Sequence, residues 1–110
     1  MKKIITTPNA PAPIGPYNQA VLSGNTLYIS GQTPINPATG ALVSGTIELE
    51  TRQVMENLKA ILEAADASFE QVVKASIFVK DMHQFKAING VYGAYFNTET
   101  APARETIEVS

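Results

Sequence analysis

The sequence contains no cysteine and no tryptophan, and it has a single histidine among its 110 residues. Without cysteine the chain can form no disulfide, no thiolate nucleophile and no cysteine-ligated metal site. One histidine cannot build a histidine-rich metal site either, so we expect no metal. That histidine, His83, falls in the first turn of an expected helix, where it is most simply a surface residue. A Ser/His/Asp triad is therefore not supported.

Charged residues are scarce, at 16% of the chain against roughly 25% in an average soluble domain. We expect other copies of the chain to cover part of the surface, although a polar, uncharged surface would give the same count. The net charge is −2, and the only arginines are Arg52 and Arg104. Because no basic stripe can follow a phosphate backbone, nucleic acid is not an expected partner.

Long apolar runs are also missing. No stretch approaches the roughly 20 apolar residues that span a membrane. The opening "MKKIITTPNAPAP" holds too short an apolar run for a secretory signal peptide. We therefore expect no membrane contact and a cytoplasmic protein. The length suits one compact domain, which we place at residues 1–110.

The first half of the chain is predicted to form a hairpin, a loop and a helix. The runs "YNQAVL" and "TLYIS" favour two strands joined by a three-residue turn at residues 23–25. Residues 31–46 are dense in Gly, Pro, Asn and Thr, so we predict a loop with at most a short strand near Leu42. Apolar residues then recur at helical spacing, which predicts a helix over about 48–66.

The second half is predicted to form a strand, a second helix and a last strand. "VVKASIFVK" alternates between apolar and polar side chains, as strands do, and Asp81 can cap the helix that follows. The apolar stripe of that helix consists of Phe85, Ile88, Tyr92 and Phe96, with Asn89 on the same face. An Asn on a buried stripe needs a hydrogen-bonding partner.

The last strand, "ARETIEV", alternates in the same way. It places Arg104, Thr106 and Glu108 on one face, and Ile107 and Val109 on the other. Right-handed crossovers would put both helices on one face of a mixed sheet, so the predicted fold class is α+β.

Arg104 has two interpretations. Charged residues are mostly exposed, so it can be a solvent-facing strand residue. It can equally be a carboxylate-binding residue, because its planar guanidinium offers paired donors at any working pH. Tyr17 can pack in a turn or line a pocket. Ser30 and Gly31 can end a strand, or Gly31 can let a ligand approach the backbone closely.

Six blocks of the sequence carry a resemblance to one family. They are "GPYNQAV", "LYISGQTPINPATG", "TRQVMENLKAILEAAD", "VVKASIFVKDM", "NGVYGAYF" and "PAR", in order over nearly the whole chain. This pattern resembles the RidA (YjgF-like) family of reactive-intermediate deaminases. The resemblance implies a homotrimer with a chorismate-mutase-like α+β fold. Its sheets would form a central barrel with the helices outside and active sites in clefts between subunits.

The resemblance also implies roles for individual residues. Arg104, in "PAR", matches the arginine that binds the substrate carboxylate in the deaminating branch. The positions that match the pocket lining are Tyr17, Ser30, Gly31 and Asn89. Thr106 stands where some relatives have cysteine. The implied reaction is hydrolysis of short 2-imino acids, such as 2-iminopropanoate and 2-iminobutanoate, without metal or organic cofactor.

One departure from the family pattern concerns the end of the chain. The family continues beyond the equivalent of Ser110 with a strand whose glutamate helps to hold the attacking water, and neither Glu105 nor Glu108 matches that position. Either the sequence is trimmed or the molecule ends there; we expect trimming, because a bare sheet edge invites aggregation. Two rival functions remain: a regulatory trimer that binds small carboxylates without turnover, and a translation inhibitor with ribonuclease activity.

Overall fold

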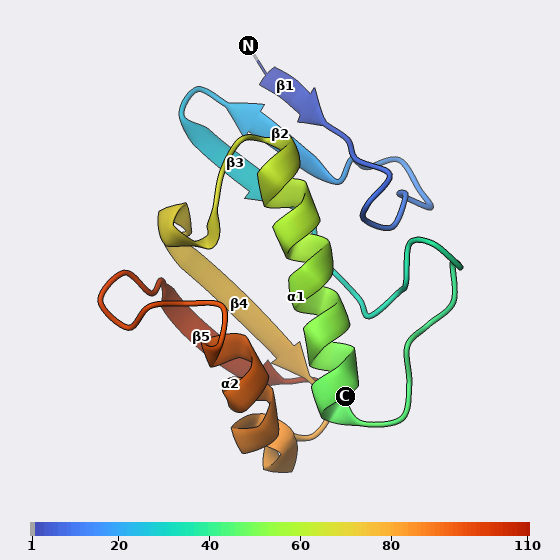
Figure 1. The fold of residues 1–110 in the computed structure, drawn as a ribbon, viewed down its shortest axis with the longest axis vertical. Helices are drawn as coiled ribbons and strands as arrows, with labels where there is room; N and C mark the ends of the chain where they lie inside the picture. Colours follow the sequence, from blue (N-terminus) through green and yellow to red (C-terminus); the bar gives the residue numbers. More distant parts are fainter. Residues whose placement is uncertain (1) are drawn as a thin grey trace.

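The computed structural model describes residues 2–110 and contains two helices and five strands in that part of the chain (Figure 1). The strands are β1 (Lys2–Ile5), β2 (Ala20–Ser23), β3 (Thr26–Ile29), β4 (Lys74–Val79) and β5 (Ala103–Glu108). The helices are α1 (Ile47–Ala64) and α2 (Phe85–Gly93), and short 3-10 turns occupy Phe69–Gln71 and Met82–Gln84. Both helices lie on the same side of the strands in Figure 1. The predicted α+β class is confirmed.

The N-terminal sheet is antiparallel, in the order β1-β2-β3. The predicted hairpin is present, but Ser23 pairs with Thr26, so its turn has two residues and not three. Gly24 in that turn has a φ of 59°, which glycine adopts without steric cost. β1 was not predicted, because four residues are too few to show a pattern; it is defined by its pairing with β2.

Helix α1 begins at a capped residue and ends two residues before the predicted boundary. The Thr46 hydroxyl accepts a hydrogen bond from the Leu49 backbone N–H at 3.1 Å, as an N-cap does. Asp66 has a φ of 56°, in the left-handed region, so the helix cannot continue through it. The helix buries Ile61 in a core cluster with Ile5 and other residues of the N-terminal segment.

The C-terminal sheet is a parallel pair, β4 and β5. Within residues 2–110 this pair is separate from the first sheet, whereas the sequence predicted one mixed sheet. Alternation shows which residues form strands, but it does not show which strands pair. Ala75, Ile77 and Val79 turn inward as predicted, while Val73 precedes the strand and is exposed.

The face of β4–β5 that is turned away from the helices carries exposed apolar side chains. Phe78 is 64% exposed, and its register partner Ile107 is 44% exposed. Val109, two residues further along the chain, is exposed to a similar extent. Such a grouping on one sheet face is typical of an interaction surface.

Candidate functional site

Arg104 lies on the face of β5 that is turned toward the helices. Its register partner in β4 is Ala75, and Thr106 pairs with Ile77. Paired residues of a parallel ladder share a face. Arg104 and Thr106 therefore lie on the inward side of the sheet together, as the alternation of the sequence predicted.

Three side chains of α2 hold the Arg104 guanidinium. Its Nη1 donates a hydrogen bond to Asn89 Oδ1 at 2.5 Å. The guanidinium carbon lies 4.9 Å from the ring centroid of Tyr92 and 5.4 Å from that of Phe85, both within cation–π range. Phe85, Asn89 and Tyr92 share one face of the helix because they are four and three residues apart. Asn89 is exposed and not buried as its place on the apolar stripe predicted, and its amide oxygen binds Arg104.

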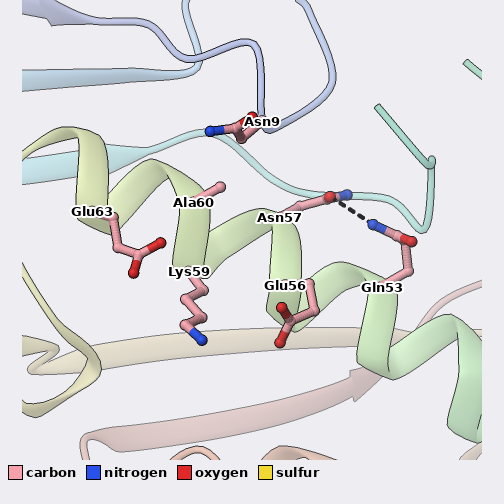
Figure 2. A pocket seen from close by; sticks show the side chains of 7 residues that line it. All are labelled: Asn9, Gln53, Glu56, Asn57, Lys59, Ala60 and Glu63. Atoms are coloured by element: carbon pink, nitrogen blue, oxygen red, sulfur yellow. Dashed lines mark hydrogen bonds between the residues drawn. The ribbon is translucent and has the colours of Figure 1, made fainter. Parts of the chain in front are cut away.

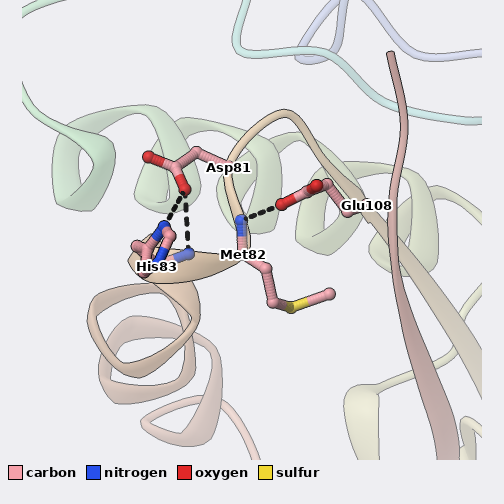
Figure 3. A network of polar contacts seen from close by, with 4 residues as sticks. All are labelled: Asp81, Met82, His83 and Glu108. Carbon is pink, nitrogen blue, oxygen red and sulfur yellow. Dashed lines mark hydrogen bonds and ion pairs between the residues drawn. The ribbon is translucent and has the colours of Figure 1, made fainter.

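A capped turn fixes where α2 begins. Asp81 Oδ1 accepts a hydrogen bond from the His83 backbone N–H at 2.9 Å and lies 3.0 Å from His83 Nδ1 (Figure 3). These contacts with His83, the backbone one first, hold the pKa of exposed Asp81 below its ordinary value. Glu108 accepts a hydrogen bond from the Met82 N–H at 2.7 Å, which ties the end of β5 to the same turn. Asp81 therefore caps the 3-10 turn Met82–Gln84 and not α2 itself, which begins after Gln84 without a side-chain cap.

No acidic side chain among residues 2–110 forms an ion pair with Arg104. Glu105 points to the opposite face of β5, where it binds Lys74 and, at 2.5 Å, the Ser76 hydroxyl. Lys74 and then Ser76 lower the pKa of Glu105, so it is a carboxylate with its own partners. Glu108 binds the Met82 N–H. The contacts of Arg104 found within residues 2–110 are with the neutral side chains Asn89, Phe85 and Tyr92.

Two buried hydroxyl groups complete the surroundings of Arg104. Within residues 2–110, Tyr92 Oη and Thr106 Oγ1 are buried and have no hydrogen-bonding partner. Burial raises the pKa of the Tyr92 phenol, while the nearby Arg104 charge opposes that shift. Tyr92 is therefore neutral near pH 7 and does not compensate the guanidinium. A guanidinium without an acidic partner is suited to bind a small anion.

The other predicted site residues lie at the end of the first sheet. The Ser30 hydroxyl donates a hydrogen bond to the Asn18 carbonyl at 2.6 Å, and the Tyr17 hydroxyl accepts one from the Ile14 N–H at 3.5 Å. Gly31 is exposed, with nothing within 4 Å of where a Cβ would lie. No contact recorded among residues 2–110 joins Tyr17, Ser30 or Gly31 to Arg104. The chain thus carries two separate groups of predicted site residues.

A cleft of about 280 Å³ lies elsewhere, along α1 (Figure 2). Its lining consists of Asn9, Gln53, Glu56, Asn57, Lys59, Ala60 and Glu63. The Asn57 amide is occupied there, because it donates to the carbonyls of Thr33 and Ile35 and accepts from Gln53. None of the predicted site residues lines this cleft, so we do not assign the site to it.

Sequence reasoning missed Phe85 and Tyr92 as neighbours of Arg104. Both were assigned to the apolar stripe of α2, although an Asn between two aromatic residues on one helix face was a usable signal. In the part of the chain that the structure describes, no group of three His, Cys, Asp or Glu side chains could hold a metal ion. No helix in that part is long and apolar enough to cross a bilayer.

Comparison with known proteins places this geometry in a family. A family model described as Endoribonuclease L-PSP matches residues 7–110. A 2-iminobutanoate/2-iminopropanoate deaminase of Dermatophagoides farinae is 47% identical, over 99% of this chain and 84% of its own. The chain belongs to the RidA (YjgF-like) family. A RutC family protein of Pyrococcus horikoshii is 54% identical, over 100% of this chain and 86% of its own.

Solved structures of other RidA-type proteins have the same fold. A Rid family protein from Yersinia pestis superposes with a TM-score of 0.97 at 45% identity, covering 100% of this chain and 87% of that one. The structure of E. coli TdcF with bound serine superposes with a TM-score of 0.90 at 38% identity, covering 97% and 85%. The chorismate-mutase-like fold expected from the sequence is thereby confirmed.

Proposed function

We propose that this RidA protein hydrolyses short 2-imino acids, such as 2-iminopropanoate and 2-iminobutanoate, to 2-oxo acids and ammonia. The observation that carries the proposal is the Arg104 guanidinium, which Asn89 and two aromatic rings hold in place without an acidic partner. A deaminase relative at 47% identity supports this reaction. TdcF binds serine, a small molecule that carries an α-carboxylate like that of the proposed substrates.

Imine hydrolysis mainly requires that the protein position the substrate. An imine carbon is already electrophilic; water adds to it, the C–N bond breaks, and ammonia leaves with the 2-oxo acid as the product. Arg104 would bind the carboxylate through paired donors. Thr106 and Asn89 would line the pocket beside it. Holding the substrate in one orientation toward a water molecule can supply most of the acceleration.

The second group of site residues would complete the pocket from a neighbouring copy. In this proposal Tyr17, Ser30 and Gly31 of one subunit face Arg104 of the next, with the Gly31 backbone near the imine end. The exposed apolar face of β4–β5 supports an assembly, and its burial would form the inside of a trimer. This arrangement explains how two groups without mutual contacts in one chain form one site.

One observation favours a second candidate, a sensing trimer that binds small carboxylates without turnover. Both glutamates of β5 have other partners, so no carboxylate in residues 2–110 stands beside Arg104 to hold a water molecule. Ribonuclease activity, the description of the matching family model, has less support. The net charge is −2, and the one histidine is exposed and pairs with Asp81.

Substitution of Arg104 tests the carboxylate role. Arg104→Ala removes a charge-assisted contact worth about 1.5–3 kcal/mol. The kcat/KM for enzymatically generated 2-iminopropanoate should therefore fall by roughly 10- to 100-fold. Arg104→Lys keeps the charge but loses the planar pair of donors, so its loss should be smaller. Arg52→Ala, at the exposed arginine on α1, is the matched control and should behave like the parent.

Calorimetric measurement of 2-oxobutanoate binding, together with the imine hydrolysis assay, separates the deaminase function from the sensing function. If the parent binds 2-oxobutanoate through Arg104 but does not accelerate imine hydrolysis, the sensing function stands and the deaminase function fails. Equal 2-oxobutanoate affinity in the parent and Arg104→Ala would refute both, because neither would then use this arginine.

A further inference from the structure

We propose that Tyr92 is a positioning residue, whose ring fixes the plane in which Arg104 presents its donors to a small carboxylate. This inference rests on the carboxylate site proposed above. It concerns the orientation of the guanidinium, so Tyr92 acts through Arg104 and does not itself touch the substrate.

The hydrogen bond to Asn89 does not by itself fix the plane of the guanidinium. Among residues 2–110 the only hydrogen bond on the guanidinium runs from Nη1 to Asn89. An arginine side chain has five N–H donors, and paired binding of a carboxylate requires them in a defined plane. One hydrogen bond at one nitrogen leaves rotation about that contact open. The Tyr92 ring, 4.9 Å away, is the nearer of the two aromatic surfaces that restrict this rotation.

The aromatic ring of Tyr92, and not its hydroxyl group, makes the contact with Arg104. Tyr92 Oη is buried and has no partner in the described part of the chain, so the contact with Arg104 is made by the ring. A phenylalanine ring presents the same kind of face to a cation. Tyr92→Phe should therefore keep the positioning effect, whereas an aliphatic side chain should lose it.

A purely structural role for Tyr92 must be distinguished from positioning. The Tyr92 ring lies 4.7 Å from that of Phe96, so its removal also weakens aromatic packing. Tyr95 offers a matched control, because its ring packs on Phe69 at 5.4 Å and makes no recorded contact with Arg104. Tyr95→Leu should weaken the same aromatic cluster while leaving the guanidinium in place.

The experiment compares Tyr92→Phe, Tyr92→Leu and Tyr95→Leu in the full chain. We would measure the 2-oxobutanoate Kd, kcat and KM for 2-iminopropanoate, and thermal unfolding. Tyr92→Leu should raise the Kd and KM by about 5- to 30-fold, the scale of a partly desolvated cation–π contact. Its kcat should change little, because the carboxylate contact is present in both the bound substrate and the transition state. Tyr92→Phe and Tyr95→Leu should bind within about twofold of the parent.

A second readout needs neither ligand nor turnover. The Arg104 Nε–Hε resonance should show a ring-current shift in the free parent and in Tyr92→Phe, and a clearly smaller one in a Leu or Met variant, where only the Phe85 ring remains. Tyr92→Met, whose flexible side chain can adapt to the vacated space without a π face, replaces Tyr92→Leu if the latter does not fold.

The outcomes separate this inference from the proposed function. Parent-like binding by Tyr92→Leu, together with weak binding by Arg104→Ala, would overturn the Tyr92 role and leave the carboxylate site standing. A Tyr92→Phe variant as weak as Tyr92→Leu would show that the hydroxyl acts and not the ring. Parent-like binding by Arg104→Ala would instead overturn the proposed function, and with it the Tyr92 role in that site.

Discussion

At the scale of single residues, the buried amide side chain of Gln19 organises the N-terminal loop of this RidA family protein. Gln19 is only 3% exposed. Its Oε1 accepts from the Thr7 N–H at 2.7 Å, and its Nε2 donates to the carbonyls of Thr7, Ala10 and Pro11. The backbone carbonyl of Gln19 accepts from the Ser30 N–H at 3.0 Å. One residue thus ties the N-terminal loop to the end of the sheet that carries Ser30.

Gln19→Leu should destabilise the fold while preserving its apolar packing. Each buried backbone group left without a partner costs about 1–3 kcal/mol. Because several such groups lose the Gln19 amide, we expect the free energy of unfolding to fall by at least about 2 kcal/mol. Urea denaturation measures this, with Gln84→Leu as the control, since exposed Gln84 makes no side-chain cap hydrogen bond. A loss below about 0.5 kcal/mol would contradict the assigned role.

At the scale of elements, α1 is joined to the segment that follows α2 by a tyrosine–glutamate hydrogen bond. Tyr95 Oη donates to Glu56 Oε2 at 2.7 Å. Burial, and then the Glu56 carboxylate, raise the pKa of Tyr95 to about 12. Phe69 packs against both Tyr95 and Phe96, so the phenol hydrogen bond lies at the rim of an aromatic cluster.

The Tyr95 phenol should give the fold an alkaline pH dependence. Its pKa is about 12 when folded, against about 10 for a tyrosine in an unfolded chain, so the folded state favours the neutral phenol. The resulting stabilisation is complete below pH 10 and is lost as the pH rises toward 12. Denaturation across this window should show a steeper loss of stability in the parent than in Tyr95→Phe. Tyr28→Phe, on exposed β3, is the control; identical curves for Tyr95→Phe and the parent would refute the assignment.

At the scale of the whole molecule, the exposed face of β4–β5 and the division of the predicted site residues into two groups both support the proposed trimer. The open face of β4–β5 exposes Phe78 and Ile107, while charged residues are only 16% of the chain. On the same face, Lys74 and Glu105 form an ion pair that is exposed in the single chain, so that their two charges compensate each other. A face with an apolar centre and few unpaired charges is suited to contact other copies.

We predict a trimer in solution that buries more than about 1,000 Å² per pair of subunits. Phe78→Asp should shift sedimentation toward the monomer, because it places a charge in the centre of the buried face. The same variant should lose imine hydrolysis if the site is shared between subunits. Glu63→Lys, on the exposed side of α1, is the control for a change of charge alone. A parent that sediments as a stable monomer at micromolar concentration would refute the prediction.

The sequence by itself determined the elements that have a long periodic pattern. Helix α1 and strand β4 follow from apolar spacing that only one conformation can place on one face. The two-residue alternation of the last strand placed Arg104 and Thr106 on one face. Asp81 marked the start of the 3-10 turn that precedes α2. These features are local, so neighbouring residues are enough to specify them.

Only the tertiary structure decided which elements meet. Spacing reports the face that a side chain occupies, but it does not report what packs against that face. The parallel pairing of β4 with β5 turned Glu105 toward Lys74 and away from Arg104. The packing of α2 on that pair gave Arg104 its contacts with Asn89 and Tyr92, which are 15 and 12 residues away in sequence. An uncompensated guanidinium is a property of that packing, because the acids that lie close in sequence are held elsewhere in space.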